Sequence, residues 1–375
     1  MRLPELIQLA SRARADGRFR AAEQYYRQAL SIQRDLPVAI RGLAELKCHT
    51  DEEVLELAFR ALASWPAESA ETSILHFAIA KVLDDLKHYE SAWSALTVAN
   101  VVQRQLIGYH ISVDLRTMLD LQGTFLRVPP SVRLRDEPRR PVFIVGLPRS
   151  GSTLLERALS RNPHFCPIGE SPLIPDTVKR LATWSEFLEA PSWHVDPYVL
   201  HTTYVDQTSW AARPLDKQLL NFCYLPLILA AFPGAKILHI SRDPLASVYG
   251  IFRQRFPGTW QFAYSLEEIA EFYIGYHRLI AAWRQILPHE SFMDVSYGRL
   301  VQDFPGTIHS IEKFLQVEPC AQSLEPEGNL LPVHTMSAVQ VREPVHTRSI
   351  DHWRHYAHHL EPTAVTLRAA GISVD

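Results

Sequence analysis

An anion-binding loop is the first feature of the chain that could do chemistry. Four apolar residues, Val142 to Val145, lead into Gly146. A second glycine, Gly151, precedes a helical run that begins at Thr153. The backbone N–H groups at the start of a helix are unpaired and lie at the positive end of the helix dipole, so they bind phosphate and similar anions. Residues 146–153 are therefore predicted to bind an anion.

This loop has the spacing of nucleoside-triphosphate loops but lacks their lysine. Ser152 occupies the position of the lysine that reaches the outer phosphates, which weakens an ATPase interpretation. The cation lies inside the loop instead, at Arg149, where its guanidinium can meet an anion bound beside the glycines. The residues predicted to bind the anion are Arg149, Ser150, Gly151, Ser152 and Thr153.

Three further candidate residues follow predicted strands. Glu170, Arg242 and Tyr297 each come just after a strand-like run. The three runs are 164–168, 236–240 and 291–295. In open α/β sheets, ligands bind outside the carboxyl ends of the strands. We therefore expect these side chains to gather near Arg149.

The second half of the chain has the pattern of a parallel α/β domain. Its strand-like runs alternate with predicted helices at 153–160, 219–231, 245–255, 266–286 and 304–315. Such alternation indicates a parallel sheet with helices on both faces. We predict an α/β domain of P-loop type over residues 141–375, because its first strand runs into the glycine-bounded loop.

Residues 1–125 have a helical pattern throughout, with a degenerate repeat. Small and aromatic residues around Ala10, Ala22 and Ala29 recur 72 residues later or nearly so. Half of this interval is close to the tetratricopeptide (TPR) period of about 34 residues, and stacked helix pairs need small residues where the helices cross. We predict an all-α, TPR-like repeat domain, with a generic helical bundle as the alternative. The Pro-rich and charged residues 126–140 are predicted to be a linker.

Composition narrows the choice of function and location. The 375 residues are enough for two or three domains, and a net charge of −3 without a dense basic block argues against nucleic-acid binding. The four cysteines form no CxxC pair, so neither a zinc site nor a disulfide framework is indicated, and a cytoplasmic location is expected. The longest apolar run, 224–231, is too short to span a membrane, and no signal peptide is indicated.

Two segments resemble those of sulfotransferases. Residues 148–154 look like the family's 5′-phosphosulfate loop, and residues 232–244 look like its 3′-phosphate segment. With the helical repeats in front, the whole chain resembles the bacterial-type TPR sulfotransferases, whose catalytic half is similar to tyrosylprotein sulfotransferases. The resemblance implies the sulfotransferase fold and transfer of a sulfuryl group from 3′-phosphoadenosine 5′-phosphosulfate (PAPS) to a hydroxyl acceptor. It also implies 3′,5′-adenosine bisphosphate as the product and no metal or permanently bound cofactor.

The resemblance also implies catalytic roles. Arg149 and Lys217, the latter in an Asp-Lys segment, would place cations near the bridging oxygen of the donor. Leu219 stands where small-molecule sulfotransferases carry their histidine base. Glu170, in a Gly-Glu segment similar to that of tyrosylprotein sulfotransferases, is then the candidate general base, which requires a carboxylate within hydrogen-bond reach of the acceptor oxygen. Ser337 resembles a family serine that hydrogen-bonds near the transferred group.

Other residues are expected to hold the donor nucleotide. Arg242 would bind the 3′-phosphate through its planar, permanently charged guanidinium. The family has a serine eight residues later, but this chain has Gly250, and Ser247, one helical turn earlier, could substitute. Tyr297 matches a tyrosine that packs against the adenine region, and Arg348 lies in the segment that closes over the nucleotide.

Four histidines near the C-terminus are predicted to form a solvated helix face. They are His352, His355, His358 and His359. Histidines three residues apart share one face of a helix, which is a metal-binding pattern, but no acidic or cysteine partner joins them at a recognisable spacing. No metal site is therefore predicted.

The sequence leaves two other functions and the identity of the acceptor open. An ATP-dependent phosphoryl-transfer enzyme would need a loop lysine and an acidic magnesium ligand, and Ser152 replaces the first. A catalytically inactive TPR interaction protein is favoured by Gly250. The repeat scaffold and the kinship with tyrosine-modifying enzymes favour a phenol on a peptide or protein, which could also be a partner of the TPR-like domain. Saccharides, lipids and small phenols are the other candidate acceptors.

Overall fold

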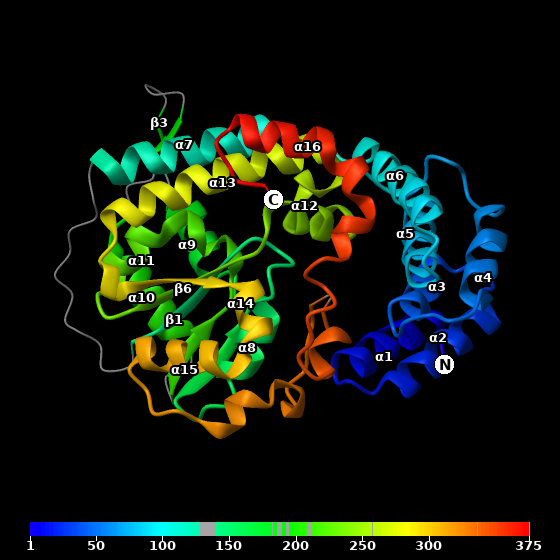
Figure 1. Ribbon diagram of the computed structural model, residues 1–375, viewed down its shortest axis with the longest axis horizontal. Helices are drawn as coiled ribbons and strands as arrows, with labels where there is room; N and C mark the ends of the chain where they lie inside the picture. Colours follow the sequence, from blue (N-terminus) through cyan, green and yellow to red (C-terminus); the bar gives the residue numbers. More distant parts are fainter. Residues whose placement is uncertain are drawn as a thin grey trace.

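The computed structural model describes residues 1–127, 140–181, 183–185, 190–192, 195–208, 212–256, 258–335 and 337–374. A row of helices, coloured blue to cyan in Figure 1, lies beside an α/β unit built on a five-stranded parallel sheet. The sheet with its covering helices confirms the predicted α/β class. The helices before it confirm the predicted all-α region at the start of the chain.

Six helices form the N-terminal row, and each contacts the next along the chain. They are α1 (Leu3–Ala15), α2 (Phe19–Ile32), α3 (Pro37–Ala44), α4 (Glu53–Leu62), α5 (Ala70–Asp85) and α6 (Tyr89–Gln105). Small residues permit this packing: Ala22 and Ala29 are fully buried, and a Cβ on Gly42 would lie 2.3 Å from Cζ of Tyr26. The tyrosine ring fills the space that the glycine leaves, which suits a stacked helical repeat. The assignment to the TPR class stays a prediction.

The seventh helix, α7 (Ile111–Arg127), joins the two parts of the molecule. It packs along α13 (Leu266–Ile286), as Figure 1 shows at the top of the view. Gly275 permits this approach, because a Cβ there would lie 2.9 Å from Cδ2 of Leu115. The helix continues through the boundary predicted at residue 125, so its end lies in the segment expected to be a linker. Residues 128–139 of that predicted linker lie outside the described residues.

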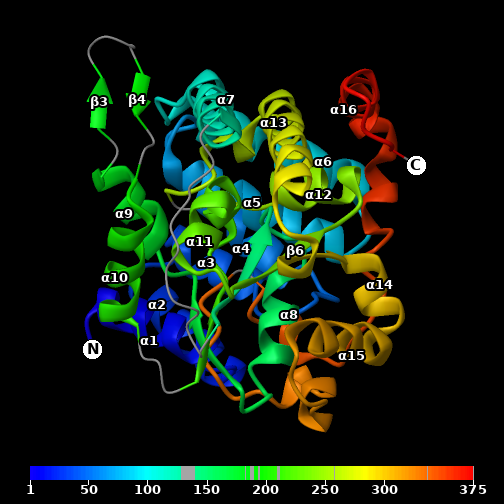
Figure 2. The same cartoon turned by 90° about the vertical axis from the view of Figure 1, so that its left-hand side faces the viewer.

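The strands of the sheet are parallel and lie in the order β2-β5-β1-β6-β7. They are β1 (Val142–Gly146), β2 (Phe165–Gly169), β5 (Arg213–Asp216), β6 (Lys236–Ser241) and β7 (Phe292–Ser296). The sequence predicts all of these except β5, which is only four residues long and contains Pro214. A separate antiparallel pair, β3 (Thr183–Ser185) and β4 (Ala190–Ser192), stands above α9 (Leu173–Leu181) in Figure 2.

Alternate residues of β1 point into two cores, one on each face of the sheet. Phe143 and Val145 belong to one core, and Val142 and Ile144 belong to the other. This alternation is the side-chain period of a strand, and all of β1 is buried. The central strand is thus covered by helices on both faces, as the sequence predicts.

The remaining elements surround the sheet. The further α-helices are α8 (Ser152–Leu159), α10 (Pro197–Gln207), α11 (Leu225–Ala231), α12 (Pro244–Phe252), α14 (Tyr297–Gln302), α15 (Phe304–Leu315) and α16 (Ala357–Ala369). The short 3-10 helices are η1 (Leu219–Tyr224), η2 (Gln261–Tyr264), η3 (His289–Ser291), η4 (Ala321–Leu324), η5 (Pro326–Gly328), η6 (Gln340–Arg342) and η7 (His352–Tyr356). The helix predicted at 219–231 therefore divides into η1 and α11. Among the described helices, none has both the length and the apolar character needed to cross a membrane.

Candidate functional site

Five candidate residues lie along the carboxyl edge of the sheet. Glu170 and Lys217 follow β2 and β5, and Arg149 follows the central strand β1. Arg242 and Tyr297 follow β6 and β7 on the other side of β1. The order of the strands in the sheet therefore divides these residues into two groups, with the loop after β1 between them.

The loop between β1 and α8 depends on two glycines in conformations that other residues rarely adopt. Gly146 has φ +150° and Gly151 has φ +97°. A Cβ on Gly146 would lie 2.3 Å from the carbonyl oxygen of Ile240, and one on Gly151 would lie 2.2 Å from Cδ2 of Tyr297. Gly151 is also the N-cap of α8 and offers no side-chain acceptor to the helix. The first N–H groups of α8 are thus left without a side-chain cap, as an anion site requires.

Gly151→Ala is expected to destabilise the protein by about 2 kcal/mol or more and to weaken anion binding, because the strained φ and the contact with Tyr297 act together. Gly371→Ala is the matched control, since Gly371 has φ +80° but a Cβ added there would meet no atom within 4 Å. Gly371→Ala should therefore lower the stability by less, because only the backbone strain contributes to its loss. Chemical denaturation of both variants measures the difference, and equal losses of stability would contradict the contact with Tyr297.

The side chain of Arg149 is held over the loop by a segment from the C-terminal part of the chain. Arg149 itself has φ +67°, which is rare for a residue other than glycine. Its Nη1 donates to Oγ of Ser337 at 2.7 Å and its Nη2 to Oε1 of Gln340 at 2.9 Å. The hydroxyls of Thr153 and Thr335 lie 3.2 Å apart. The loop with Arg149 and Thr153 therefore lies beside a segment that is distant in the sequence and carries Ser337.

Arg242 lies beside Arg149 with part of its hydrogen-bonding capacity unused. Its guanidinium stacks over the ring of Tyr297, 5.0 Å from the ring centre, and donates to the backbone oxygen of Ser349. The hydroxyl of Tyr297 is 2.6 Å from Oγ of Ser349. The Nε of Arg242 is buried and has no hydrogen-bond partner among the described residues. A buried, unpaired N–H of a cation calls for an anionic acceptor.

Arg253, at the end of α12, is a third cation at this place, and the sequence reasoning missed it. Burial and the charges of Arg253 and Arg242 lower the pKa of Arg149 to about 10. Burial also lowers the pKa of Arg242, and Arg253 adds to this effect. The charge of Arg253 thus disfavours the charged forms of Arg149 and Arg242, and a bound anion would relieve this repulsion. The signal available in the sequence was the spacing, since Arg253 is three residues beyond Gly250 and residues three apart are neighbours on a helix.

These cations line a cavity of about 400 Å³ between the two parts of the molecule. Its lining includes Arg149, Gly151, Thr153, Arg242, Arg253, Tyr297, Ser337, Arg348 and Ser349, together with residues of α5 and α6. The volume is typical of a small-molecule site. A ligand with several negative charges suits this cavity, because three guanidiniums, a buried N–H without a partner and the start of α8 lie along it.

Glu170 and Lys217 form a pair outside that cavity. Nζ of Lys217 donates to Oε1 of Glu170 at 2.7 Å and lies 3.6 Å from Oε2 of Glu156 on α8. The side chain of Lys217 is 2% exposed, whereas that of Glu170 is 51% exposed. Neither residue is among the described residues that line the cavity. Lys217 therefore contacts the candidate base directly, on the opposite side of β1 from Arg242.

The structure also places the other residues inferred to hold the donor, Ser247 and Arg348. Ser247 is buried with its Oγ 3.5 Å from the backbone oxygen of Arg242, and it is not among the described residues of the cavity lining. A Cβ on Gly250 would lie 3.2 Å from Cβ of Arg149, so a side chain here would crowd that arginine. Arg348 does line the cavity, and its guanidinium pairs with the carboxylate of Glu343.

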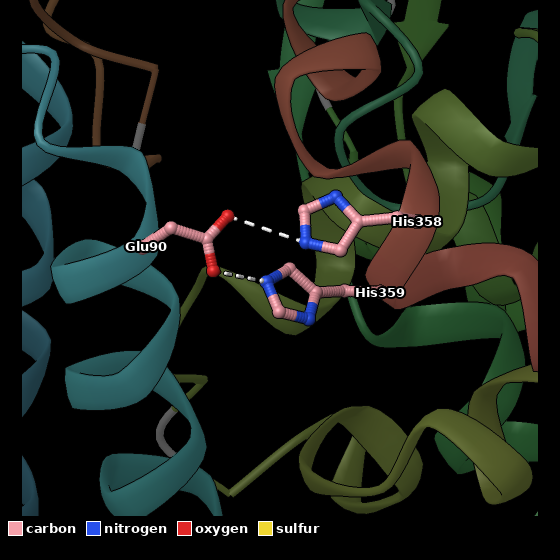
Figure 3. Close-up of side chains that lie close together, drawn as sticks. All are labelled: Glu90, His358 and His359. Carbon is pink, nitrogen blue, oxygen red and sulfur yellow. Dashed lines mark hydrogen bonds and ion pairs between the residues drawn. The ribbon is translucent and has the colours of Figure 1, made fainter.

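A group of potential metal ligands lies away from these residues. Among the described residues, Glu90, His358 and His359 bring their ligand atoms within 4.8 Å of one another (Figure 3). Each imidazole Nε2 lies 3.2 Å from an oxygen of Glu90, so protonated histidines would pair α16 with α6. Glu90 is an acidic partner that no sequence spacing reveals, because it lies 269 residues from His359. The group sits at the first turn of α16, where the helix dipole disfavours a bound cation.

The four histidines do not share one solvated face. His355 and His358 are exposed, but His352 and His359 are partly buried. His352 lies 2.8 Å from Oδ1 of Asp84, and the ring of His359 stacks on Trp93. The prediction of a solvated face is therefore wrong for His352 and His359.

The α/β part of the chain is similar to sulfotransferases. Residues 141–321 match the model of the sulfotransferase family. An uncharacterized protein of Aquifex aeolicus (strain VF5) is 29% identical over 377 residues, covering 94% of this chain and 48% of the relative. This chain thus spans about half of that relative's length. A putative protein-tyrosine sulfotransferase of Caenorhabditis briggsae is 23% identical over 235 residues, covering 56% of this chain and 80% of the relative.

Solved structures of sulfotransferases are similar to part of the chain. The sulfotransferase domain of the Synechococcus PCC 7002 olefin synthase has a TM-score of 0.47 at 20% identity, over 64% of this chain and 98% of that domain. Mouse sulfotransferase SULT7A1 complexed with PAP has a TM-score of 0.40 at 14% identity, over 62% of this chain and 86% of that chain. The sequence match to the sulfotransferase family covers residues 141–321, slightly less than half of the chain.

Proposed function

We propose that this protein transfers a sulfuryl group from PAPS to a hydroxyl acceptor. The observation that carries the proposal is the cavity in which Arg149, Arg242 and Arg253 lie beside a lysine-free loop and the uncapped start of α8. Part of its lining lies in residues 141–321, which match the sulfotransferase family model. PAPS carries negative charge at both its 3′-phosphate and its 5′-phosphosulfate. These two anionic groups of PAPS match the cations of the cavity, since Arg149 follows β1 and Arg242 follows β6.

The residues of the cavity suggest how the donor would lie. Arg242, with its unpaired Nε, is proposed to hold the 3′-phosphate together with Arg253. The loop from Ser150 to Thr153 would hold the 5′-phosphosulfate, since its N–H groups lie at the start of α8. Tyr297 would then support the nucleotide between the two anionic groups, with its ring fixed by Arg242 and its hydroxyl by Ser349.

The proposed reaction breaks the bond between sulfur and the bridging oxygen of the donor and forms a bond between sulfur and the acceptor oxygen. Charge grows on the bridging oxygen, which becomes a phosphate oxygen of 3′,5′-adenosine bisphosphate, so cations there lower the barrier. Arg149 and Lys217 are proposed to supply them, with Ser337 fixing the guanidinium of Arg149. Glu170 is proposed to accept the proton of the acceptor hydroxyl, which requires its carboxylate to turn from Lys217 toward that oxygen.

The acceptor is proposed to be a phenol on a peptide or protein. The exposed position of Glu170 supports a large acceptor, because a carboxylate that is 51% exposed is accessible to a side chain on another polypeptide. The relative from Caenorhabditis briggsae, a putative protein-tyrosine sulfotransferase, agrees with this class of acceptor.

Binding of the product tests the proposal without knowledge of the acceptor. At 100 times its Kd, 3′,5′-adenosine bisphosphate is expected to stabilise the protein by about 2.7 kcal/mol, which raises the Tm by several degrees. ATP with magnesium, which lacks the 3′-phosphate, is expected to bind at least about tenfold more weakly. Calorimetry measures the Kd values of the two nucleotides. Tighter binding of ATP with magnesium would favour a phosphoryl-transfer enzyme and contradict the proposal.

A further inference from the structure

The N-terminal helices form one wall of the donor cavity. The residues of α5 and α6 that line it are Phe77, Ala80, Lys81, Asp84, Asp85, Ala92 and Leu96. Asp84 differs from the others because its carboxylate bonds directly to the α/β unit. Its side chain is 7% exposed, and a buried carboxylate needs partners to stay ionised.

Asp84 has partners on two separate segments of the α/β unit. Oδ2 of Asp84 accepts from Nη2 of Arg253 at 3.1 Å, and Oδ1 lies 3.5 Å from the hydroxyl of Tyr249. Oδ1 also accepts from the hydroxyl of Tyr356 and lies 2.8 Å from Nε2 of His352. Burial by itself would raise the pKa of Asp84, but the charge of Arg253 and the bonds from His352 and Tyr356 outweigh it and hold the pKa below its usual value.

These two segments carry Arg253 or contact the other two arginines of the cavity. Arg253 and Gly250 belong to the end of α12, and Gly250 packs against Arg149. The turn before η7 carries Ser349, which contacts both Arg242 and Tyr297. One carboxylate from the helical row therefore joins both segments at the back of the cavity.

A second contact of the helical row supports the opposite side of the cavity. The backbone oxygen of Ala15, at the end of α1, accepts from the N–H of Val333 at 2.9 Å and from Nη2 of Arg342. The segment between these two residues carries Ser337 and Gln340, which hold the guanidinium of Arg149. The helical row thus contacts the segments around the cavity at two places, through Asp84 and through Ala15.

We propose that Asp84 is a positioning residue for the donor, which makes the N-terminal helical row part of the donor-binding site; this inference rests on the proposed function. Asp84 fixes the guanidinium of Arg253 beside Arg242 and neutralises part of the repulsion among the three arginines while the cavity is empty. Without the carboxylate, the partly buried guanidinium of Arg253 loses its counter-ion and turns toward water. The cation that would meet the 3′-phosphate then leaves its place.

Asp84→Asn in the full chain tests this role, with Glu268→Gln as the matched control. Glu268 of α13 pairs with Arg104 of α6 at 2.8 Å across the same boundary, but it does not line the cavity. Both variants are expected to lower the Tm of the unliganded protein. Asp84→Asn alone is expected to raise the Kd of 3′,5′-adenosine bisphosphate about tenfold or more, because a charge-assisted contact is lost. The Kd of 5′-AMP, which lacks the 3′-phosphate, is expected to change much less.

The outcomes separate this inference from the proposed function. If the bisphosphate binds Asp84→Asn as tightly as it binds Glu268→Gln, or more tightly, the positioning role is overturned while the proposed function stands. If the two nucleotides lose affinity equally, Asp84 acts on the fold alone and the inference is again overturned. A wild-type protein that does not bind the bisphosphate would overturn the proposed function. Should Asp84→Asn fail to fold, Tyr356→Phe replaces it, because this change removes one hydrogen bond to Asp84. It is expected to raise the Kd of the bisphosphate but not that of 5′-AMP. An unchanged Kd of the bisphosphate would overturn the positioning role of Asp84.

Discussion

Arg149→Met is expected to lower the rate of sulfuryl transfer by about 10³-fold or more. Arg149 is the cation of the loop after β1, and two hydrogen bonds to Ser337 and Gln340 fix its guanidinium. Methionine keeps most of the side-chain volume but removes the charge that would stabilise the leaving oxygen. Removal of a fixed positive charge at the reacting group raises the barrier more than removal of any neutral contact.

Single-turnover transfer from a labelled donor measures this effect. Arg354→Met is the control, because Arg354 is 56% exposed and pairs with Asp351 at the surface. Its rate is expected to stay within about threefold of the wild type, since surface ion pairs contribute little. A rate for Arg149→Met within tenfold of the wild type would contradict the role of Arg149.

Glu170→Gln is expected to lower turnover by about 10²–10⁴-fold and to leave the Kd of 3′,5′-adenosine bisphosphate nearly unchanged. Glutamine has the shape of glutamate but cannot accept a proton from the acceptor hydroxyl. Binding of the donor nucleotide should be unaffected, because Glu170 is not among the described residues that line the cavity.

Glu156→Gln is the matched control for Glu170→Gln. Glu156 is a second carboxylate that pairs with Lys217, at 3.6 Å from its Nζ, and burial raises the pKa of its carboxyl group. The control separates loss of the base from disturbance of Lys217, and its turnover is expected to fall by less than about tenfold. Equal losses for the two variants would mean that both act through Lys217, and full activity of Glu170→Gln would exclude Glu170 as the base.

Local patterns were sufficient to predict the central part of the fold. The run Val142 to Val145 is apolar because β1 is buried on both faces, so its strand and the loop after it can be read from the sequence. The strand β6 could be predicted as well, because Ile237, Leu238 and Ile240 within it are apolar and buried. The strand β5 could not be read, because a four-residue segment with an arginine, a proline and an aspartate has no strand pattern. Its position in the sheet is decided by its neighbours β1 and β2.

The sequence predicts those residues of the site that come directly after a strand. Arg149, Arg242 and Tyr297 could be found in this way, since the carboxyl ends of parallel strands share an edge. Contacts between distant parts of the chain were not predictable. Asp84 meets His352 across 268 residues, and no periodicity connects them. The same limit explains why Glu90 was missed as the partner of the C-terminal histidines.

The most direct test of sulfuryl transfer uses PAPS labelled with radioactive sulfur, the pure protein and an extract of the organism that encodes it. The label is expected to move to a hydroxyl-bearing product, with release of an equal amount of 3′,5′-adenosine bisphosphate, in the absence of added ATP and metal. Arg149→Met should leave the label on the donor. A wild-type protein that also leaves all of the label on the donor, while it moves the terminal phosphate of ATP to a product, would contradict the account.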